Sequence, residues 1–199
     1  MTSAPDLVAV GLGNPTGQYE GTRHNLGAMA VRLLAERHGA ELKRERLLHA
    51  EVAPARIGGK LLVLAVPKTY MNESGAAVRP LWRRYVDQSS AAPEEALVIV
   101  HDELDLPPGT VRVKAGGGTA GNNGLRSIVH HLHRQDFLRV RIGIGKPPGR
   151  GQGVDHVLKR PTAREAEIFQ VAVEVAADAV EAILCDGIAA AMNRYNAKS

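Results

Sequence analysis

The sequence alternates short apolar runs with segments whose apolar residues recur at helical spacing, and this alternation limits the folds open to it. Residues 6–12 are mostly apolar, as expected of a strand buried on both faces. Residues 26–34 then place apolar side chains at i, i+3, i+4, i+7 and i+8, the pattern of an amphipathic helix, which Gly39 closes. No repeat or linker divides the 199 residues. The pattern therefore predicts a single α/β domain, residues 1–199, with a twisted, mixed, mainly parallel sheet flanked by helices.

Several further elements are expected along the chain. Gly58 and Gly59 separate two apolar runs and predict a hairpin, and Asn72 is a candidate cap for the helix that follows it. Arg139 and Arg141 alternate with apolar residues, which predicts a strand with one wet face. The expected strands are residues 6–12, 51–57, 60–66, 96–100, 110–114 and 138–144, and the expected helices are 26–39, 72–85, 125–132, 162–186 and a short final segment.

The C-terminal half and the ends of the chain carry three more expectations. Residues 146–153, rich in glycine and proline, are expected to form a mobile loop, and residues 1–5 a disordered tail. In the helix predicted at 162–186, the side chains expected to face inward are Ile168, Val171, Val175 and Ala179.

The charge of the chain favours an anionic partner, with nucleic acid the obvious one. The formal net charge is +4 and the pI is near 9.4. A basic protein without such a partner fits these values equally well. The basic residues that could form a patch are Lys114, Arg139, Arg141, Lys146, Arg150, Lys159 and Arg160.

The single cysteine, Cys185, excludes an internal disulfide and is consistent with a reducing cytosol. Because it lies among apolar residues near the end of a helical pattern, we expect a buried structural thiol. The N-terminus lacks the basic and apolar regions of a signal peptide, and no apolar stretch is long enough to span a membrane. These features predict a soluble, cytoplasmic protein.

Three apolar strands lead into polar residues that a core would not select. The runs are followed by Asn14, by Asn72 and by Asp102. Ligands of open α/β sheets bind outside the carboxyl ends of parallel strands. If the three strands are parallel neighbours, these side chains lie along one rim, and His24, at the start of the first helix, opens onto it.

This combination suits acid–base chemistry. Histidine is the usual general base near neutral pH, and a carboxylate on its second ring nitrogen fixes its tautomer. The asparagine amides can orient a substrate or stabilise an oxyanion. No serine or cysteine has a comparable position, so the nucleophile would be water. A histidine alone at a helix start would be structural; its pairing with Asp102 and the asparagines favours catalysis.

Two other kinds of site have weaker signals. Gly11 and Gly13 resemble the start of a dinucleotide fingerprint, but Gly17 comes one residue late and no strand ends in a ribose-binding acid at the required distance. The segment 101–105 could supply metal ligands, and a histidine cluster lies on the helix near residue 130, but no metal-binding spacing is present. A solvated helix face is the better interpretation of His130, His131 and His133.

Four ordered motifs resemble bacterial-type peptidyl-tRNA hydrolase. The first combines Gly11-Leu12-Gly13-Asn14-Pro15 with Tyr19 and Thr22-Arg23-His24-Asn25. The second is Lys68-Thr69-Tyr70-Met71-Asn72, followed by Ser74-Gly75. The third runs from His101 to Gly109 and continues with Lys114, Gly116 to Gly118 and Asn123-Gly124-Leu125. The fourth is Arg139-Val140-Arg141-Ile142-Gly143-Ile144-Gly145. The resemblance extends from about Leu7 to the final helix.

The resemblance implies hydrolysis of the ester that joins a peptide to the 3′ end of tRNA, by a cytoplasmic monomer that needs no metal or organic cofactor. It implies that His24 activates water with Asp102 as its partner, and that Asn14 and Asn72 position water and the peptidyl group. The remaining substrate contacts that it implies are Asn123 at the cleft entrance, Tyr70 as an aromatic residue lining the cleft, Tyr19 near the base, and Lys114 and Arg141 on tRNA phosphates.

One segment departs from the family pattern. Thr119 and Asn122 stand where many members have histidine, and Ala120 stands where they have glycine. The departure concerns substrate contact and the mobility of a gate-like loop, because alanine adopts positive φ less readily than glycine. Three alternatives remain: a non-catalytic RNA-binding protein on the same fold, a metal-dependent hydrolase, and a nucleotide-binding oxidoreductase.

Overall fold

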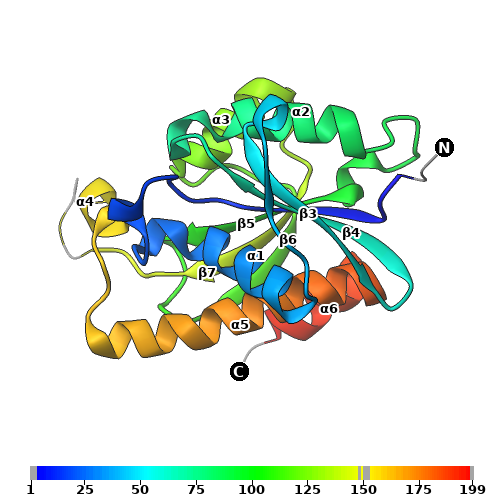
Figure 1. The fold of residues 1–199 in the computed structure, drawn as a ribbon. Helices are drawn as coiled ribbons and strands as arrows, with labels where there is room; N and C mark the ends of the chain where they lie inside the picture. Colours follow the sequence, from blue (N-terminus) through cyan, green and yellow to red (C-terminus); the bar gives the residue numbers. More distant parts are fainter. Residues whose placement is uncertain (1–3, 148, 150–152, 198–199) are drawn as a thin grey trace.

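The six apolar runs of the sequence become strands of one sheet. The computed structural model describes residues 4–147, 149 and 153–197, and within them a seven-stranded sheet has helices on both faces (Figure 1). The strands are β1 Leu7–Gly11, β2 Lys43–Glu45, β3 Ala50–Ile57, β4 Lys60–Pro67, β5 Leu97–Glu103, β6 Val111–Ala115 and β7 Leu138–Gly143. The helices are α1 Leu26–Arg37, α2 Ser74–Tyr85, α3 Asn123–Leu132, α4 Gly153–Leu158, α5 Ala163–Asp186 and α6 Ile188–Asn196.

The strand order is β2-β3-β4-β1-β5-β7-β6. The four central strands, β4, β1, β5 and β7, are parallel, and the strands at both sides join them antiparallel. The predicted hairpin is confirmed, since Ile57 of β3 pairs with Lys60 of β4. The predicted α/β fold with a mixed, mainly parallel sheet is therefore confirmed.

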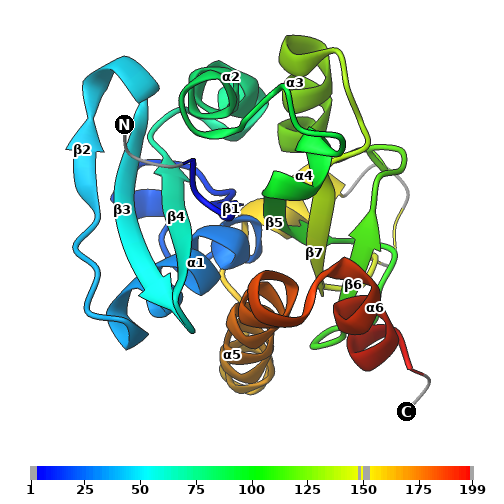
Figure 2. The same cartoon turned by 90° about the vertical axis from the view of Figure 1, so that its right-hand side faces the viewer.

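The sheet separates two apolar cores. α2 and α3 cover one face, while α1, α5 and α6 lie on the other, as the end-on view shows (Figure 2). β1 and the apolar part of β5 are buried along their whole length, because both of their faces are covered. The sheet therefore holds the carboxyl ends of its central strands in a rigid frame.

Two glycines let α1 lie directly against β1 and β5. A Cβ atom on Gly11 would come within 2.3 Å of the Gly27 carbonyl oxygen, and one on Gly27 within 2.1 Å of the Val100 carbonyl oxygen. Neither Gly11 nor Gly13 has a positive φ, so these two glycines serve close packing. This packing fixes the start of α1, and with it the short turn that carries His24.

The buried face of α5 differs from the prediction. Val171 is 61% exposed and Ile168 is 39% exposed, whereas Phe169 and Val173 are buried. The buried stripe is rich in alanine, which lets the helix approach the sheet closely and turns some larger residues outward. Of the residues predicted to face inward, Ala179 is buried, Val175 is partly buried, and the other two are exposed.

Two local predictions are wrong for other reasons. β7 has no fully wet face, because Arg139 is buried and only Arg141 is half-buried. Asn72 does not cap α2: it lies in a short 3-10 turn, η4 (Met71–Glu73), and the residue before the helix is Glu73. The extra turn moves the helix start beyond Asn72.

Cys185 is exposed, not buried, because it lies on the outer side of the last turn of α5. Of the expected tail, residues 1–3 lie outside the described residues, as do 148 and 150–152 of the expected loop, and Gly153 already begins α4. Within the described ranges, no helix combines the length and apolar character needed to cross a membrane.

The contact between Gly27 and β5 predicts a large effect of a single methyl group. Gly27→Ala should lower the free energy of unfolding by about 2–3 kcal/mol, because the added Cβ collides with backbone that cannot yield. Urea unfolding measures the change. Gly17→Ala is the matched control, since a Cβ there meets nothing within 4 Å. Equal stability of the two variants would contradict the packing argument.

Candidate active site

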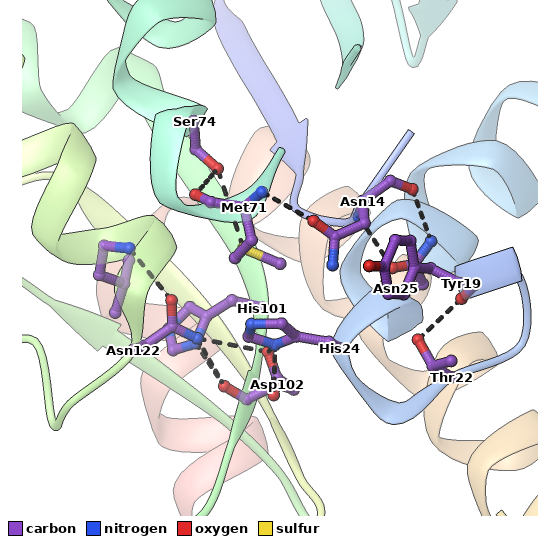
Figure 3. A network of polar contacts seen from close by, with 11 residues as sticks. Asn14, Tyr19, Thr22, His24, Asn25, Met71, Ser74, His101, Asp102 and Asn122 are labelled. Carbon is purple, nitrogen blue, oxygen red and sulfur yellow. Dashed lines mark hydrogen bonds and ion pairs between the residues drawn. The ribbon is translucent and has the colours of Figure 1, made fainter. Parts of the chain in front are cut away.

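The carboxyl ends of three adjacent parallel strands meet at one edge of the sheet, as predicted. β1 lies between β4 and β5 and pairs with both. Asn14 follows β1, the turn η4 follows β4, and Asp102 lies near the end of β5. Figure 3 shows Asn14, Met71 of η4 and Asp102 together with His24, so residues far apart in sequence form one cluster of polar contacts.

His24 and Asp102 form a buried pair. His24 lies in the 3-10 turn η2 (Arg23–Asn25) just before α1, and is 7% exposed; Asp102 is 3% exposed. The ring Nδ1 lies 2.9 Å from both carboxylate oxygens of Asp102. Since the ionised carboxylate only accepts, Nδ1 carries the proton and Nε2 is left with the lone pair of a base. The predicted pairing of these two residues is present.

Asn14 is held so that its amide has one orientation. The backbone N–H of Met71 donates to Asn14 Oδ1 at 2.8 Å. Because the Met71 N–H can only donate, the amide atom that it contacts is the oxygen of Asn14. The amide nitrogen Nδ2 is therefore the group that Asn14 can offer to a ligand. Asn25 fixes the backbone beneath, accepting from Asn14 N at 2.8 Å and donating to Asn14 O at 3.0 Å. Sequence reasoning quoted Asn25 in a motif but gave it no role.

A cavity of about 150 Å³ opens beside the histidine–carboxylate pair. Apolar side chains from α4 and from just after β5 line one part of it, among them Val154 and Leu104. The polar residues that line it are His24, Asp102, Glu103, Asn122 and Asn123. Among the described residues that line it there is no serine, threonine or cysteine. A small molecule or chain end that enters this cavity meets His24, whose Nδ1 is already engaged by Asp102.

The other predicted substrate residues are more exposed. Asn72 and Tyr70 lie at η4, and Tyr70 is 48% exposed. η4 packs against α3, the helix that begins with Asn123. Tyr19 lies in another 3-10 turn, η1 (Gly17–Tyr19), where its carbonyl accepts from the Thr22 hydroxyl. Of these four, only Asn123 lines the cavity with His24.

Basic side chains gather where β6 and β7 pair. Lys114 stands opposite Arg139 in the antiparallel ladder, and Arg112 stands opposite Arg141, so all four point to one face. Arg141 donates to Glu103 at 3.1 Å, whereas exposed Lys114 has no acidic partner among the described residues. This face therefore offers Lys114 as its most available positive charge.

Arg139 supports the glycine-rich segment that follows β6. Its guanidinium donates to the carbonyl oxygens of Gly117 and Gly118, and to that of Gln135 at 3.2 Å. Burial and the nearby Arg141 lower the pKa of Arg139 below its ordinary value. The buried arginine therefore holds the loop from beneath, a role that alternation of apolar and polar residues could not predict.

Arg23, the neighbour of His24, ties η2 to the segment between α4 and α5. It is 6% exposed and donates to the Lys159 carbonyl at 3.1 Å. Its Nη2 donates to both carboxylate oxygens of Glu165, each at 2.8 Å. Glu165 also accepts from the backbone of Thr162 in a capping box at the start of α5. Sequence reasoning missed this role of Arg23.

The structure also shows the surroundings of two other groups of histidines, the cluster near residue 130 and His101. His130 is exposed on α3 and His133 is exposed just after it, but His131 is half-buried with its Nδ1 2.8 Å from the Ser127 carbonyl, so the predicted solvated face holds for only two of the three. The described residues contain no group of three side chains able to hold a metal ion. His101 is buried, its Nδ1 donates to the Asp102 carbonyl at 2.8 Å, and burial lowers its pKa, which keeps the ring neutral. It therefore supports the backbone of Asp102 without adding charge.

The fold and the site together define a class of protein: an α/β protein with a histidine–carboxylate pair and amide donors at the carboxyl ends of parallel strands. The family model described as peptidyl-tRNA hydrolase matches residues 8–199. The chain belongs to the peptidyl-tRNA hydrolase family.

Individual relatives are similar over nearly the whole chain. Peptidyl-tRNA hydrolase of Mycolicibacterium vanbaalenii is 47% identical over 98% of this chain and 98% of its own length. That of Frankia casuarinae is 49% identical over 97% of this chain and 94% of its own. The crystal structure of peptidyl-tRNA hydrolase from Acinetobacter baumannii has a TM-score of 0.89 and 38% identity, and covers 100% of this chain and 99% of that one.

The bond between Arg23 and Glu165 predicts a pH-dependent contribution to stability. The Arg23 side chain and the Thr162 backbone lower the pKa of Glu165 to about 2, from a model-peptide value of 4.5. A lowered carboxyl pKa stabilises the fold fully above pH 4.5 and loses this effect as the pH falls towards 2. Glu165→Gln should therefore lower the free energy of unfolding by about 2 kcal/mol at pH 7 and by less at pH 3.

Urea unfolding at the two pH values measures this difference. Glu167→Gln is the control on the same helix, since its side chain is exposed, and it should change stability by less than about 0.5 kcal/mol. A Glu165→Gln effect that is the same at pH 7 and pH 3 would argue against an ionic contribution.

Proposed function

We propose that this chain hydrolyses the ester between the peptide and the 3′ end of tRNA in peptidyl-tRNA, and so recycles tRNA from aborted translation. The observation that carries the proposal is the His24–Asp102 pair, buried beside a cavity, with the oriented amide of Asn14 in the same polar cluster (Figure 3). Membership of the peptidyl-tRNA hydrolase family supports the choice of substrate.

The reaction begins with a water molecule held at His24 Nε2. The ring takes a proton from this water as its oxygen attacks the ester carbonyl, and Asp102 stabilises the imidazolium that forms. Nδ2 of Asn14 is the available donor for the oxyanion or for the peptidyl group. When the tetrahedral intermediate collapses, the C–O bond to the ribose breaks and His24 returns the proton to the 3′ oxygen of tRNA. The products are a peptide carboxylate and tRNA with a free 3′ hydroxyl.

Water suits this chemistry because no hydroxyl or thiol side chain is among the described residues that line the cavity, and the two serines nearest η4 are already hydrogen-bonded. Ser74 is fully buried and its Oγ donates to the Met71 carbonyl. Ser127 Oγ accepts from the backbone of Gly75. An ester leaves more readily than an amide, so the mechanism requires no covalent intermediate and no cofactor.

The remaining predicted residues have substrate-binding roles in this proposal. Asn123 holds the substrate at the cavity entrance, and Asn72 contacts the peptidyl group from η4. Tyr70 and Tyr19 supply aromatic surface for the substrate. Lys114 and Arg141 contact tRNA phosphates, with Lys114 supplying the larger share because Glu103 neutralises part of the charge of Arg141. The protein acts as a cytoplasmic monomer.

Replacement of the base tests the proposal. His24→Ala should lower the rate of release of an N-acylated amino acid from tRNA by about 10³-fold, within the range attributed to general bases. His130→Ala is the control, because that histidine is exposed on α3, away from the cavity lining. Unchanged turnover in His24→Ala would contradict the mechanism. Wild-type protein that binds tRNA without turnover would instead favour the non-catalytic RNA-binding alternative.

A further inference from the structure

Asn122 stands at the junction between the glycine-rich loop and α3, and both ends of its side-chain amide are engaged. Its Oδ1 accepts from the backbone N–H of Leu125 at 3.1 Å, which makes Asn122 the N-cap of α3. Its Nδ2 points to Asp102, 3.3 Å from the carboxylate Oδ1 and 3.4 Å from the backbone carbonyl (Figure 3). Because the backbone N–H of Leu125 is a donor, the amide atom of Asn122 that it contacts must be the oxygen. The atom that contacts Asp102 is therefore the amide nitrogen, which donates to the carboxylate.

The Asp102 carboxylate therefore has donors on two sides. Nδ1 of His24, from η2, lies 2.9 Å from both oxygens, and Nδ2 of Asn122, from the start of α3, lies 3.3 Å from Oδ1. A carboxylate held by a single ring could rotate about its Cβ–Cγ bond. The second donor, carried by the end of a helix, restricts that rotation and sets the plane in which His24 is held.

The loop before Asn122 has a backbone that needs such anchoring. Gly117, Ala120 and Gly121 all have positive φ, and Ala120, at φ +47°, lacks the freedom of glycine there. Arg139 binds the carbonyls of Gly117 and Gly118, and Asn122 N donates to the Thr119 carbonyl at 2.9 Å. The segment is thus fastened by Arg139 at one end and by Asn122 at the other.

We propose that Asn122 is a positioning residue. It holds the Asp102 carboxylate at a fixed position relative to the start of α3, so that His24 and Asn123 face the same cavity. Asn123 is the next residue, the first of α3, and both it and His24 line that cavity. This inference rests on the proposed function, since it concerns the alignment of the same base.

Among the described residues, the other charged and titratable groups near Asp102 do not donate to its carboxylate, so Asn122 is its second side-chain donor after His24. His101, on the same strand, is neutral and donates only to the backbone carbonyl of Asp102. Glu103 lines the cavity, but Arg141 from β7 and the backbone of Asp105 engage it. From α4, His156 contacts the Ile144 carbonyl instead. A carboxylate introduced at position 122 would therefore act directly on the His24–Asp102 pair.

Three variants separate the cap of α3 from the contact to Asp102. Asn122→Ser keeps an oxygen for Leu125 but is too short to reach Asp102, so kcat should fall about tenfold with Tm within about 2 °C of wild type. Asn122→His can donate to Asp102 without capping α3, so kcat should stay within about threefold while Tm falls by about 2–4 °C. Asn122→Asp keeps the cap and replaces the donor by a second carboxylate, so kcat should fall about tenfold to a hundredfold.

The pH profile distinguishes positioning from a purely structural role. In Asn122→Asp the acidic limb of kcat should move to higher pH, because a second carboxylate beside Asp102 favours the imidazolium of His24. KM should change less than about threefold, since Asn123 remains in place. Asn193→Asp is the matched control, the same change on an exposed residue of α6, and should leave kcat, Tm and the profile unaltered.

The proposal is overturned if Asn122→Ser and Asn122→Asp keep wild-type kcat and pH profile, or if kcat among the three variants follows Tm alone. A wild-type protein without turnover would refute the proposed function instead. In that case the NMR signal of the His24 Nδ1 proton still tests the positioning role of Asn122, because this measurement needs no turnover. It should shift in Asn122→Asp and Asn122→Ser, and an unmoved signal in both would overturn the positioning role.

Discussion

The contact between His24 Nδ1 and the Asp102 carboxylate is the interaction on which the rest of the site depends. It joins the start of α1 to the end of β5, two segments 78 residues apart in sequence, and both side chains are almost fully buried. Burial makes the pair strong, since a carboxylate removed from water must find its donors within the protein. It also fixes the histidine tautomer, and so decides which ring nitrogen can act as a base.

The pair exists because two kinds of packing bring its partners together. On one side, Gly11 and Gly27 let α1 approach the sheet until backbone meets backbone, which sets the height of η2 above β5. On the other side, Arg23 binds the carbonyls at the end of α4 and the carboxylate of Glu165, so the turn that carries His24 cannot swing outward. Neither glycine nor Arg23 has to touch a substrate, yet each constrains where the base stands.

The sequence allowed the sheet, its parallel centre and the meeting of Asn14, His24 and Asp102 to be predicted, because apolar runs and the polar residues after them are local signals. Features that depend on packing could not be predicted this way. The inward face of α5 uses alanines where larger apolar residues were expected, and Arg139 is buried because loop carbonyls bind its guanidinium. The amides of Asn25 and Asn122 gain roles only through partners that are remote in sequence or folded into turns.

The most direct test of the central claim is the tautomer of His24, read by ¹⁵N NMR of protein with labelled histidine. The spectrum is recorded at about pH 8.5, on the alkaline side of the usual titration range of free histidine. With Asp102 accepting from Nδ1, we expect the spectrum to show Nδ1 protonated and Nε2 bare, and we expect Asp102→Asn to abolish this preference. A His24 ring protonated mainly at Nε2 in the wild-type protein would contradict the account, because Nε2, the nitrogen that Asp102 does not engage, could not then accept a proton from water.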